Sequence, residues 1–205
     1  MMQSQVVPNR VTNPDLLAAM RMLPRERFLD APYQEFAYSD HPIPLGTSGR
    51  RCLLPLQAAW LIQALEAGRG ERVLVVGAGT GYEAALLADM GCKVHALESD
   101  PILAAIGREA TAAANVVWQV RGLAAGWPEE APFARILFCG AVTHIPAFGR
   151  QQLTREGQLV AVVGQPNAPV MHAIRLSGSG GPEERLFETV VTSLPDLSPA
   201  AAFEI

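Results

Sequence analysis

The sequence has few of the features that mark membrane, secreted or nucleic-acid-binding proteins. No apolar run reaches about 18 residues, so no membrane-spanning helix is predicted. The only cysteines are Cys52, Cys92 and Cys139, and their spacing matches neither a disulfide framework nor a metal site. The formal net charge of −4 gives no reason to expect nucleic acid, and the polar start MMQSQVVPNRV predicts no signal peptide. We therefore expect a cytoplasmic protein that binds no metal, nucleic acid or membrane.

What the sequence contains is typical of one globular unit. Of its 205 residues, 49% are hydrophobic and 18% are charged. From residue 72 onward, predicted strands alternate with predicted helices, which is typical of an α/β protein with a mostly parallel sheet covered on both faces. We expect strands over 72–77, 93–99, 116–120, 134–141 and 157–164, and helices over 82–90, 101–113 and 146–153. Two later strands, 170–177 and 185–194, flank the turn GSGGP and are expected to be antiparallel.

The N-terminal part has a different pattern. Asn13 is a suitable N-cap for a helix that begins at Pro14 and that Pro24 terminates. Residues 38–55 are rich in proline and glycine, which predicts a long loop or extended edge structure, and a helix is expected over 56–65. We expect residues 1–55 to form a helical and loop appendage that packs on a single compact domain, residues 56–205.

A glycine-rich turn, GAGTG, follows the first predicted strand of this domain directly. Gly77, Gly79 and Gly81 allow positive φ and a close approach of the backbone to a ligand at the N-terminus of the next helix. Glu98 ends the next predicted strand, 98 − 77 = 21 residues after the first glycine. This spacing suits a carboxylate that accepts hydrogen bonds from both ribose hydroxyls of an adenosine. The alternative is a tight turn without a ligand.

The spacing of the glycines separates two cofactor classes. Dinucleotide sites favour G-x-G-x-x-G, whereas this turn reads G-x-G-x-G and continues with Tyr82. The shorter pattern resembles that of S-adenosylmethionine-dependent methyltransferases, and the antiparallel end of the sheet agrees with their fold. A nicotinamide-dependent oxidoreductase is disfavoured.

Several motifs narrow this resemblance to one family. The chain is similar to protein-L-isoaspartate O-methyltransferases in the segments SQVVPNRVTNPDLLAAMRMLPRERFLD, YSDHPIPLG, VLVVGAGTGYEAALLADMG, GWPEEAPFARILFCGAVTHIP and QQLTREGQLVAVVG. These segments occur in the family's order between Ser4 and Gly164.

The resemblance implies a Rossmann-like methyltransferase fold with an N-terminal helical extension. It implies transfer of a methyl group from S-adenosylmethionine to the free carboxylate of an L-isoaspartyl residue in damaged protein, in a monomer or homodimer. The methyl ester then cyclises to a succinimide, which repairs part of the damage. The implied cofactor-binding residues are Gly77, Ala78, Gly79, Gly81, Glu98, Ser99, Gly122 and Leu123.

The chain departs from the family pattern at three positions. Leu53 stands where the family has a hydroxyl residue that contacts the substrate carboxylate, Val75 replaces an acid before the glycine turn, and Gly122 replaces an aspartate on the adenine side. No catalytic residue is therefore identified. The candidates that could compensate are Thr47, Ser48, Arg51 and His144. The departures keep open a second hypothesis: a non-catalytic or substrate-shifted relative that retains the fold to bind a nucleoside or a partner.

Overall fold

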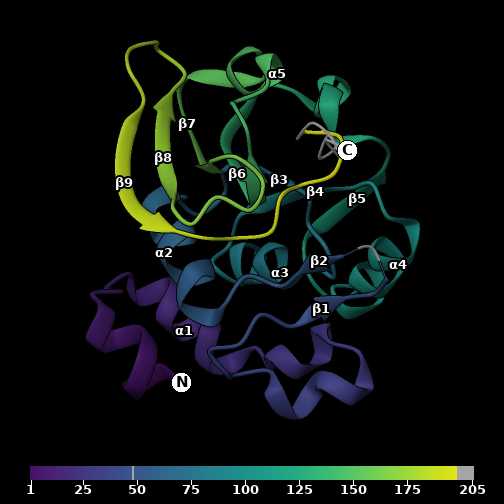
Figure 1. The fold of residues 1–205 in the computed structure, drawn as a ribbon. Coiled ribbons are helices and arrows are strands. Elements are labelled where there is room, and N and C mark those ends of the chain that lie inside the picture. The colour runs from purple at the N-terminus through teal and green to yellow at the C-terminus, as the bar shows by residue number, and fades with distance from the viewer. Residues whose placement is uncertain (48, 198–205) are drawn as a thin grey trace, which may run out of the picture.

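A seven-stranded sheet forms the centre of the molecule (Figure 1). The computed structural model describes residues 1–47 and 49–197. The strand order is β5-β4-β3-β6-β7-β8-β9; the first five are parallel, and β8 runs antiparallel to both neighbours. The strands are β3 (Arg72–Val76), β4 (Lys93–Glu98), β5 (Val116–Val120), β6 (Phe133–Val142), β7 (Leu153–Val163), β8 (Met171–Ser177) and β9 (Glu184–Thr189). The predicted mostly parallel sheet with an antiparallel ending is confirmed.

Helices cover both faces of this sheet because its strands are apolar on both sides. They are α1 (Pro14–Met22), α2 (Pro55–Leu65), α3 (Tyr82–Asp89), α4 (Pro101–Ala110) and α5 (Ala147–Gln151). Alternate residues of β3 enter different cores: Val73 and Val75 pack with α2 and α3, whereas Leu74 and Val76 pack with Phe148 of α5 on the other side. Val75, which stands where the family has an acid, is fully buried in the first core. Among the described residues, no helix combines the length and the apolar character needed to cross a bilayer.

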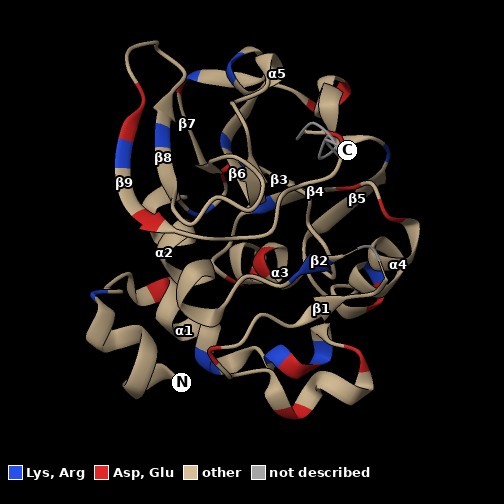
Figure 2. Ribbon diagram, viewed as in Figure 1, with Lys and Arg blue, Asp and Glu red and all other residues tan. Residues whose placement is uncertain are grey.

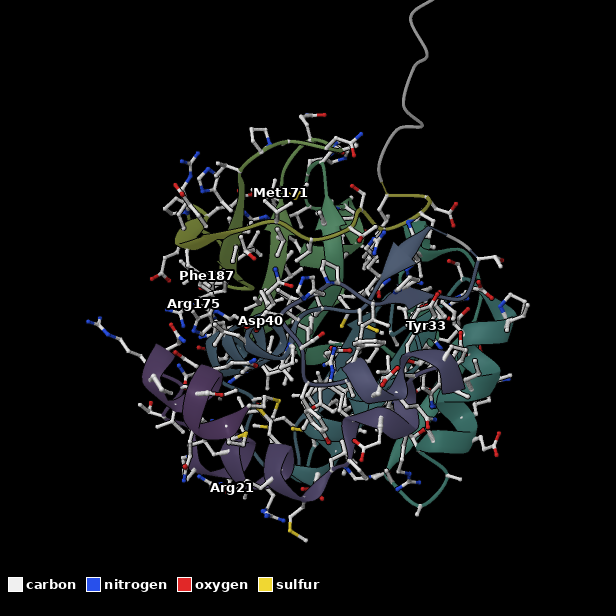
Figure 3. The ribbon with its side chains drawn as sticks, turned by 60° about the horizontal axis from the view of Figure 1, so that its bottom comes forward. Arg21, Tyr33, Asp40, Met171, Arg175 and Phe187 are labelled. Atoms are coloured by element: carbon white, nitrogen blue, oxygen red, sulfur yellow. The ribbon has the colours of Figure 1, made fainter. Side chains whose placement is uncertain are left out.

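The N-terminal segments lie against the face that α2 and α3 cover, and Figure 3 brings them to the front. Asn13 caps α1, since its side chain accepts a hydrogen bond from the Leu16 amide at 3.0 Å. Short helical turns η3 (Arg25–Phe28) and η4 (Ala31–Phe36) follow. The predicted loop contains a small antiparallel hairpin of β1 (Pro44–Leu45) and β2 (Arg50–Arg51), which crosses in front of α3 and α4 in Figure 1.

The C-terminal segment crosses the carboxyl ends of the parallel strands. It leaves β9, passes over β6 and ends near β5, as the yellow trace in Figure 1 shows. Ser193 pairs with Ala141, and the Leu194 amide donates to the Ala141 carbonyl at 2.8 Å. The predicted last strand, 185–194, is therefore wrong in its second half: β9 ends at Thr189, because the chain turns to pair with β6 instead of β8.

Other boundaries also differ from the sequence predictions. The helix expected over 146–153 is only α5, since β7 begins at Leu153, four residues earlier than predicted. The end of α2 at Leu65 agrees with the prediction, and its C-cap is Glu66, a non-glycine residue with a φ of 52°.

Close packing of α4 on β5 generates a stability prediction. A Cβ atom on Gly107 would lie 2.2 Å from Cη2 of Trp118 and 2.5 Å from its Cζ2. Alanine favours a helix over glycine by about 1 kcal/mol, but overpacking costs about 1–3 kcal/mol. We expect Gly107→Ala to lower the free energy of unfolding by about 1–2 kcal/mol in urea denaturation. In a Trp118→Leu background this loss should disappear, and stabilisation of the wild-type background would contradict the packing account.

Candidate functional site: a glycine turn closed by an ion pair

The glycine turn has the backbone geometry expected of a ligand-binding loop. Gly77 and Gly79 have φ values of +70° and +58°, in the left-handed region that glycine adopts without strain. The amides of Gly77 and Ala78 both donate to the Leu97 carbonyl, which fixes the turn against the end of β4. Gly81 has a φ of +91° and precedes α3, but a Cβ there would lie 2.8 Å from Trp118. Gly81 therefore serves the packing of α3 against β5.

Glu98 lies beside this turn, as the spacing predicted. It is fully buried at the end of β4, and its Oε2 atom accepts a hydrogen bond from the Gly79 amide at 2.6 Å. Its Oε1 atom accepts hydrogen bonds from the amides of Ser99 at 2.8 Å and Asp100 at 2.9 Å. Ser99 therefore contributes its backbone amide to the carboxylate.

The carboxylate of Glu98 is already paired within the protein. Arg50 of β2 reaches it with Nη1 at 2.6 Å, and the Nη2 atom of the same guanidinium donates to the Gly77 carbonyl at 2.8 Å. Both side chains are withdrawn from solvent: the exposed fraction is 6% for the Arg50 side chain and 0% for the Glu98 side chain. Arg50 thus binds both the Gly77 carbonyl of the turn and the Glu98 carboxylate of β4, the two groups that a ribose would approach.

The space in front of the turn is correspondingly small. We call it the inner cavity, lined among others by Arg25, Arg50, Leu53, Gly77, Tyr82 and Glu83. Its volume is about 20 Å³, close to the room that one water molecule requires. The residues fit a nucleoside chemically, but a cavity of this volume does not hold one while the side chains keep this arrangement.

The C-terminal segment closes the turn from the other side. A Cβ on Gly77 would lie 2.4 Å from Cδ2 of Leu194. Gly122 lies under the same segment, since a Cβ there would be 3.7 Å from Oδ2 of Asp196. A carboxylate from the C-terminal segment therefore lies beside the position where the sequence lacks one. Leu123 is fully buried in the core with Leu74 and Val76, so only its backbone can face a ligand.

The structure does not gather the four candidates for catalysis. Thr47 is exposed, and Ser48 lies outside the described residues. Arg51 is exposed and donates to the Pro42 carbonyl at 2.9 Å. His144 is exposed, with Nδ1 3.1 Å from the Thr143 hydroxyl, and it lines a separate groove beside Asp196 and Leu197.

Sequence reasoning missed the role of two buried arginines. Arg25 and Arg50 look like surface charges in the sequence, yet 3% and 5% of them are exposed. Figure 2 shows the basic β2 in the middle of the molecule, near α3. Glu83 of α3 lines the inner cavity together with Arg25 and Arg50. The proline- and glycine-rich pattern of residues 38–55 predicted a long loop around Arg50 but not that its side chain turns inward, and Arg25 lies outside that loop.

The fold and the turn together define a class. A parallel sheet with one antiparallel strand, a G-x-G-x-G turn after β3 and a buried acid at the end of β4 are typical of Rossmann-like methyltransferases.

Comparisons with known proteins identify the family. The family described as Protein-L-isoaspartate(D-aspartate) O-methyltransferase (PCMT) matches residues 2–191. The Protein-L-isoaspartate O-methyltransferase of Methylorubrum populi is 38% identical over 192 residues, which cover 93% of this chain and 90% of that protein. The protein of the same name from Anaeromyxobacter dehalogenans is 39% identical, with 82% of each chain covered. This chain belongs to the protein-L-isoaspartate(D-aspartate) O-methyltransferase family.

Solved structures agree at the level of the fold. A protein-L-isoaspartate O-methyltransferase structure superposes with a TM-score of 0.79 at 22% identity, covering 92% of this chain and 63% of that one. A β-aspartate methyltransferase (PCMT) from Plasmodium falciparum, in complex with S-adenosyl-L-homocysteine, gives a TM-score of 0.73 at 20% identity, covering 90% and 92%. The predicted family and fold are confirmed.

The buried ion pair leads to a second stability prediction. Removing one partner of a buried pair leaves an uncompensated charge, which typically costs 3–5 kcal/mol. Because three backbone amides still support Glu98, we expect Arg50→Ala to lower the free energy of unfolding by about 3 kcal/mol, near the bottom of that range. The neighbouring exposed Arg51→Ala should cost about 1 kcal/mol or less. Equal effects of the two variants in chemical denaturation would contradict a buried pair.

Proposed function

We propose that this chain is an S-adenosylmethionine-dependent methyltransferase that methylates the carboxylate of isoaspartyl residues in damaged protein. Membership of the family over residues 2–191 is the observation that carries the proposal. When bound, S-adenosylmethionine supplies an activated methyl group. A carboxylate is already ionised at neutral pH, so the acceptor requires no strong base. The chain's task is then to hold the two reactants in line.

The residues proposed for the cofactor lie around the glycine turn. The backbone can approach a ligand closely at Gly77, Ala78 and Gly79. Glu98, which the Ser99 amide supports, is proposed as the carboxylate that accepts hydrogen bonds from the ribose hydroxyls. On the adenine side we propose the backbone of Gly122 and Leu123, with Asp196 as the missing carboxylate. Gly81 is assigned to the shape of the turn. Because Arg50 occupies Glu98, binding is proposed to require its displacement.

The wider assignments follow the same proposal. We propose residues 1–55 as an appendage that closes over the methyltransferase domain of residues 56–205, since Arg50 reaches the glycine turn from that appendage. The acceptor would be a protein or peptide in the cytoplasm. Nucleic acid and membranes are not proposed as partners.

One observation favours a second function. Arg50 lines the small inner cavity, Leu194 lies against Gly77 of the turn, and Leu53 carries no hydroxyl. A relative that keeps the fold without catalysis, and binds a partner or a nucleoside, would have the same features. The two functions differ in turnover, which is directly measurable.

Methyl transfer tests the choice between them. We expect the protein to bind S-adenosylhomocysteine in calorimetry and to transfer a labelled methyl group from S-adenosylmethionine to an isoaspartyl peptide. The same peptide with normal aspartate is the control and should remain unlabelled. Binding without transfer would support the non-catalytic function, and no binding at high ligand concentration would contradict both nucleoside-based functions.

Two substitutions at the ion pair should change cofactor affinity in opposite directions. Glu98→Gln replaces a charged acceptor with two oxygens by a neutral amide with one and should weaken S-adenosylhomocysteine binding by about 1.5–3 kcal/mol, the range of a charged hydrogen bond. Arg50→Gln removes the competitor for Glu98 and should tighten binding by a similar amount. Arg51→Gln serves as the control with an exposed charge removed. Weaker binding by Arg50→Gln would mean that Arg50 itself contacts the nucleoside.

A further inference from the structure

Arg25 is a buried cation whose hydrogen-bonding capacity is largely unused. Only 3% of it is exposed, and one nitrogen, Nη2, donates to the Leu53 carbonyl at 2.6 Å. Its Nε and Nη1 atoms have no hydrogen-bond partner among the described residues. A guanidinium has five N–H donors, and a buried charge without partners is strongly destabilised. This arrangement therefore calls for an acceptor that enters from outside.

The surroundings of Arg25 reinforce this requirement. Its guanidinium lies over the ring of Tyr82, 4.6 Å from the centroid, and the Tyr82 hydroxyl is also buried without a hydrogen-bond partner among the described residues. Glu83 is the acid that interacts with Arg25, but burial raises the pKa of Glu83 and so favours its neutral form. Since Nε and Nη1 of Arg25 have no hydrogen-bond partner among the described residues, Glu83 does not pair with the guanidinium directly. The guanidinium keeps N–H groups for an anion, and the Tyr82 hydroxyl that interacts with it lies beside them.

The position of Arg25 connects it with the proposed reaction. Arg25 and Tyr82 line the inner cavity together with Gly77 and Gly79, where the methyl donor is proposed to bind. The bond from Arg25 to the Leu53 carbonyl places the guanidinium beside the backbone of the residue that stands where the family has a hydroxyl. A planar guanidinium is the side chain best suited to a carboxylate, because it can donate two parallel hydrogen bonds.

A groove on the surface shares part of its wall with this cavity. An outer groove of about 460 Å³ is lined among others by Arg51, Cys52, Gln57, Met171, Val190 and Thr192. Arg51 and Cys52 line both the inner cavity and the outer groove. Met171, labelled in Figure 3, begins β8 on the groove side. A peptide in the groove would direct one carboxylate past Arg51 and Cys52 toward Arg25.

We propose that Arg25 binds the acceptor carboxylate of the peptide substrate, with the Tyr82 hydroxyl as a second donor, and so replaces the hydroxyl that Leu53 lacks. The ligand class is a peptide carboxylate held next to the methyl donor. This assignment rests on the proposed function and names the residue that determines acceptor specificity.

Two peptides that differ at one group test it. In calorimetry with an excess of S-adenosylhomocysteine, an isoaspartyl peptide is compared with the same peptide whose isoaspartyl carboxylate is a carboxamide. We expect the wild-type protein to prefer the carboxylate by about ten- to a hundredfold, the ratio that charged hydrogen bonds supply. Arg25→Gln should bring the ratio near unity. Arg25→Lys should retain part of it, since it keeps the charge but not the fork.

The ratio of the two peptide affinities distinguishes recognition of the carboxylate by Arg25 from a purely structural role. If Arg25 only supports the Leu53 backbone, Arg25→Gln will weaken both peptides equally and leave the ratio unchanged, which would overturn the proposal. A wild-type protein without preference would overturn it as well. Arg27→Gln, which removes an exposed charge from the same turn, should preserve the ratio. Failure of the proposed function appears separately, as absence of S-adenosylhomocysteine binding or of methyl transfer.

Discussion

The ion pair between Arg50 and Glu98 determines whether the Glu98 carboxylate is available to a ligand. It joins the N-terminal hairpin to the end of β4 and, through the Gly77 carbonyl, to the glycine turn. Removing two charges from water is costly, and attraction compensates only when the remaining donors and acceptors are satisfied. Here the three backbone amides that surround Glu98 provide that satisfaction. The pair is therefore stable in the closed protein and competes directly with any ligand of the same carboxylate.

This competition affects how tightly a chain with the family's fold binds its cofactor. A cofactor that uses Glu98 must supply hydrogen bonds that replace those of a guanidinium, and the cost of that exchange lowers its apparent affinity. Leu194 adds a second barrier, because its side chain lies against Gly77. The two barriers come from the hairpin and from the C-terminal segment, and the second of these is held to β6 by the hydrogen bonds of Ala141 with Thr192 and Leu194.

The sequence predicted the parts of this arrangement that depend on local patterns. Apolar strands that alternate with helices, the positive φ of Gly77 and Gly79 and the N-cap at Asn13 are set by neighbouring residues, and the structure has them where they were expected. The proximity of Glu98 to the turn followed from the parallel connection between β3 and β4. The direction of Arg50 did not follow, because a charged residue in a loop is ordinarily solvated. Its burial depends on an acid 48 residues away. The path of Thr192–Leu194 could not be predicted from the sequence either, since a β pattern does not specify with which strand a segment will pair.

A crystal structure of the protein with S-adenosylhomocysteine tests the central claim most directly. The account predicts that the Glu98 carboxylate accepts hydrogen bonds from the two ribose hydroxyls, with the Arg50 guanidinium withdrawn from it. A nucleoside bound elsewhere while the Arg50–Glu98 pair remains intact would contradict the account.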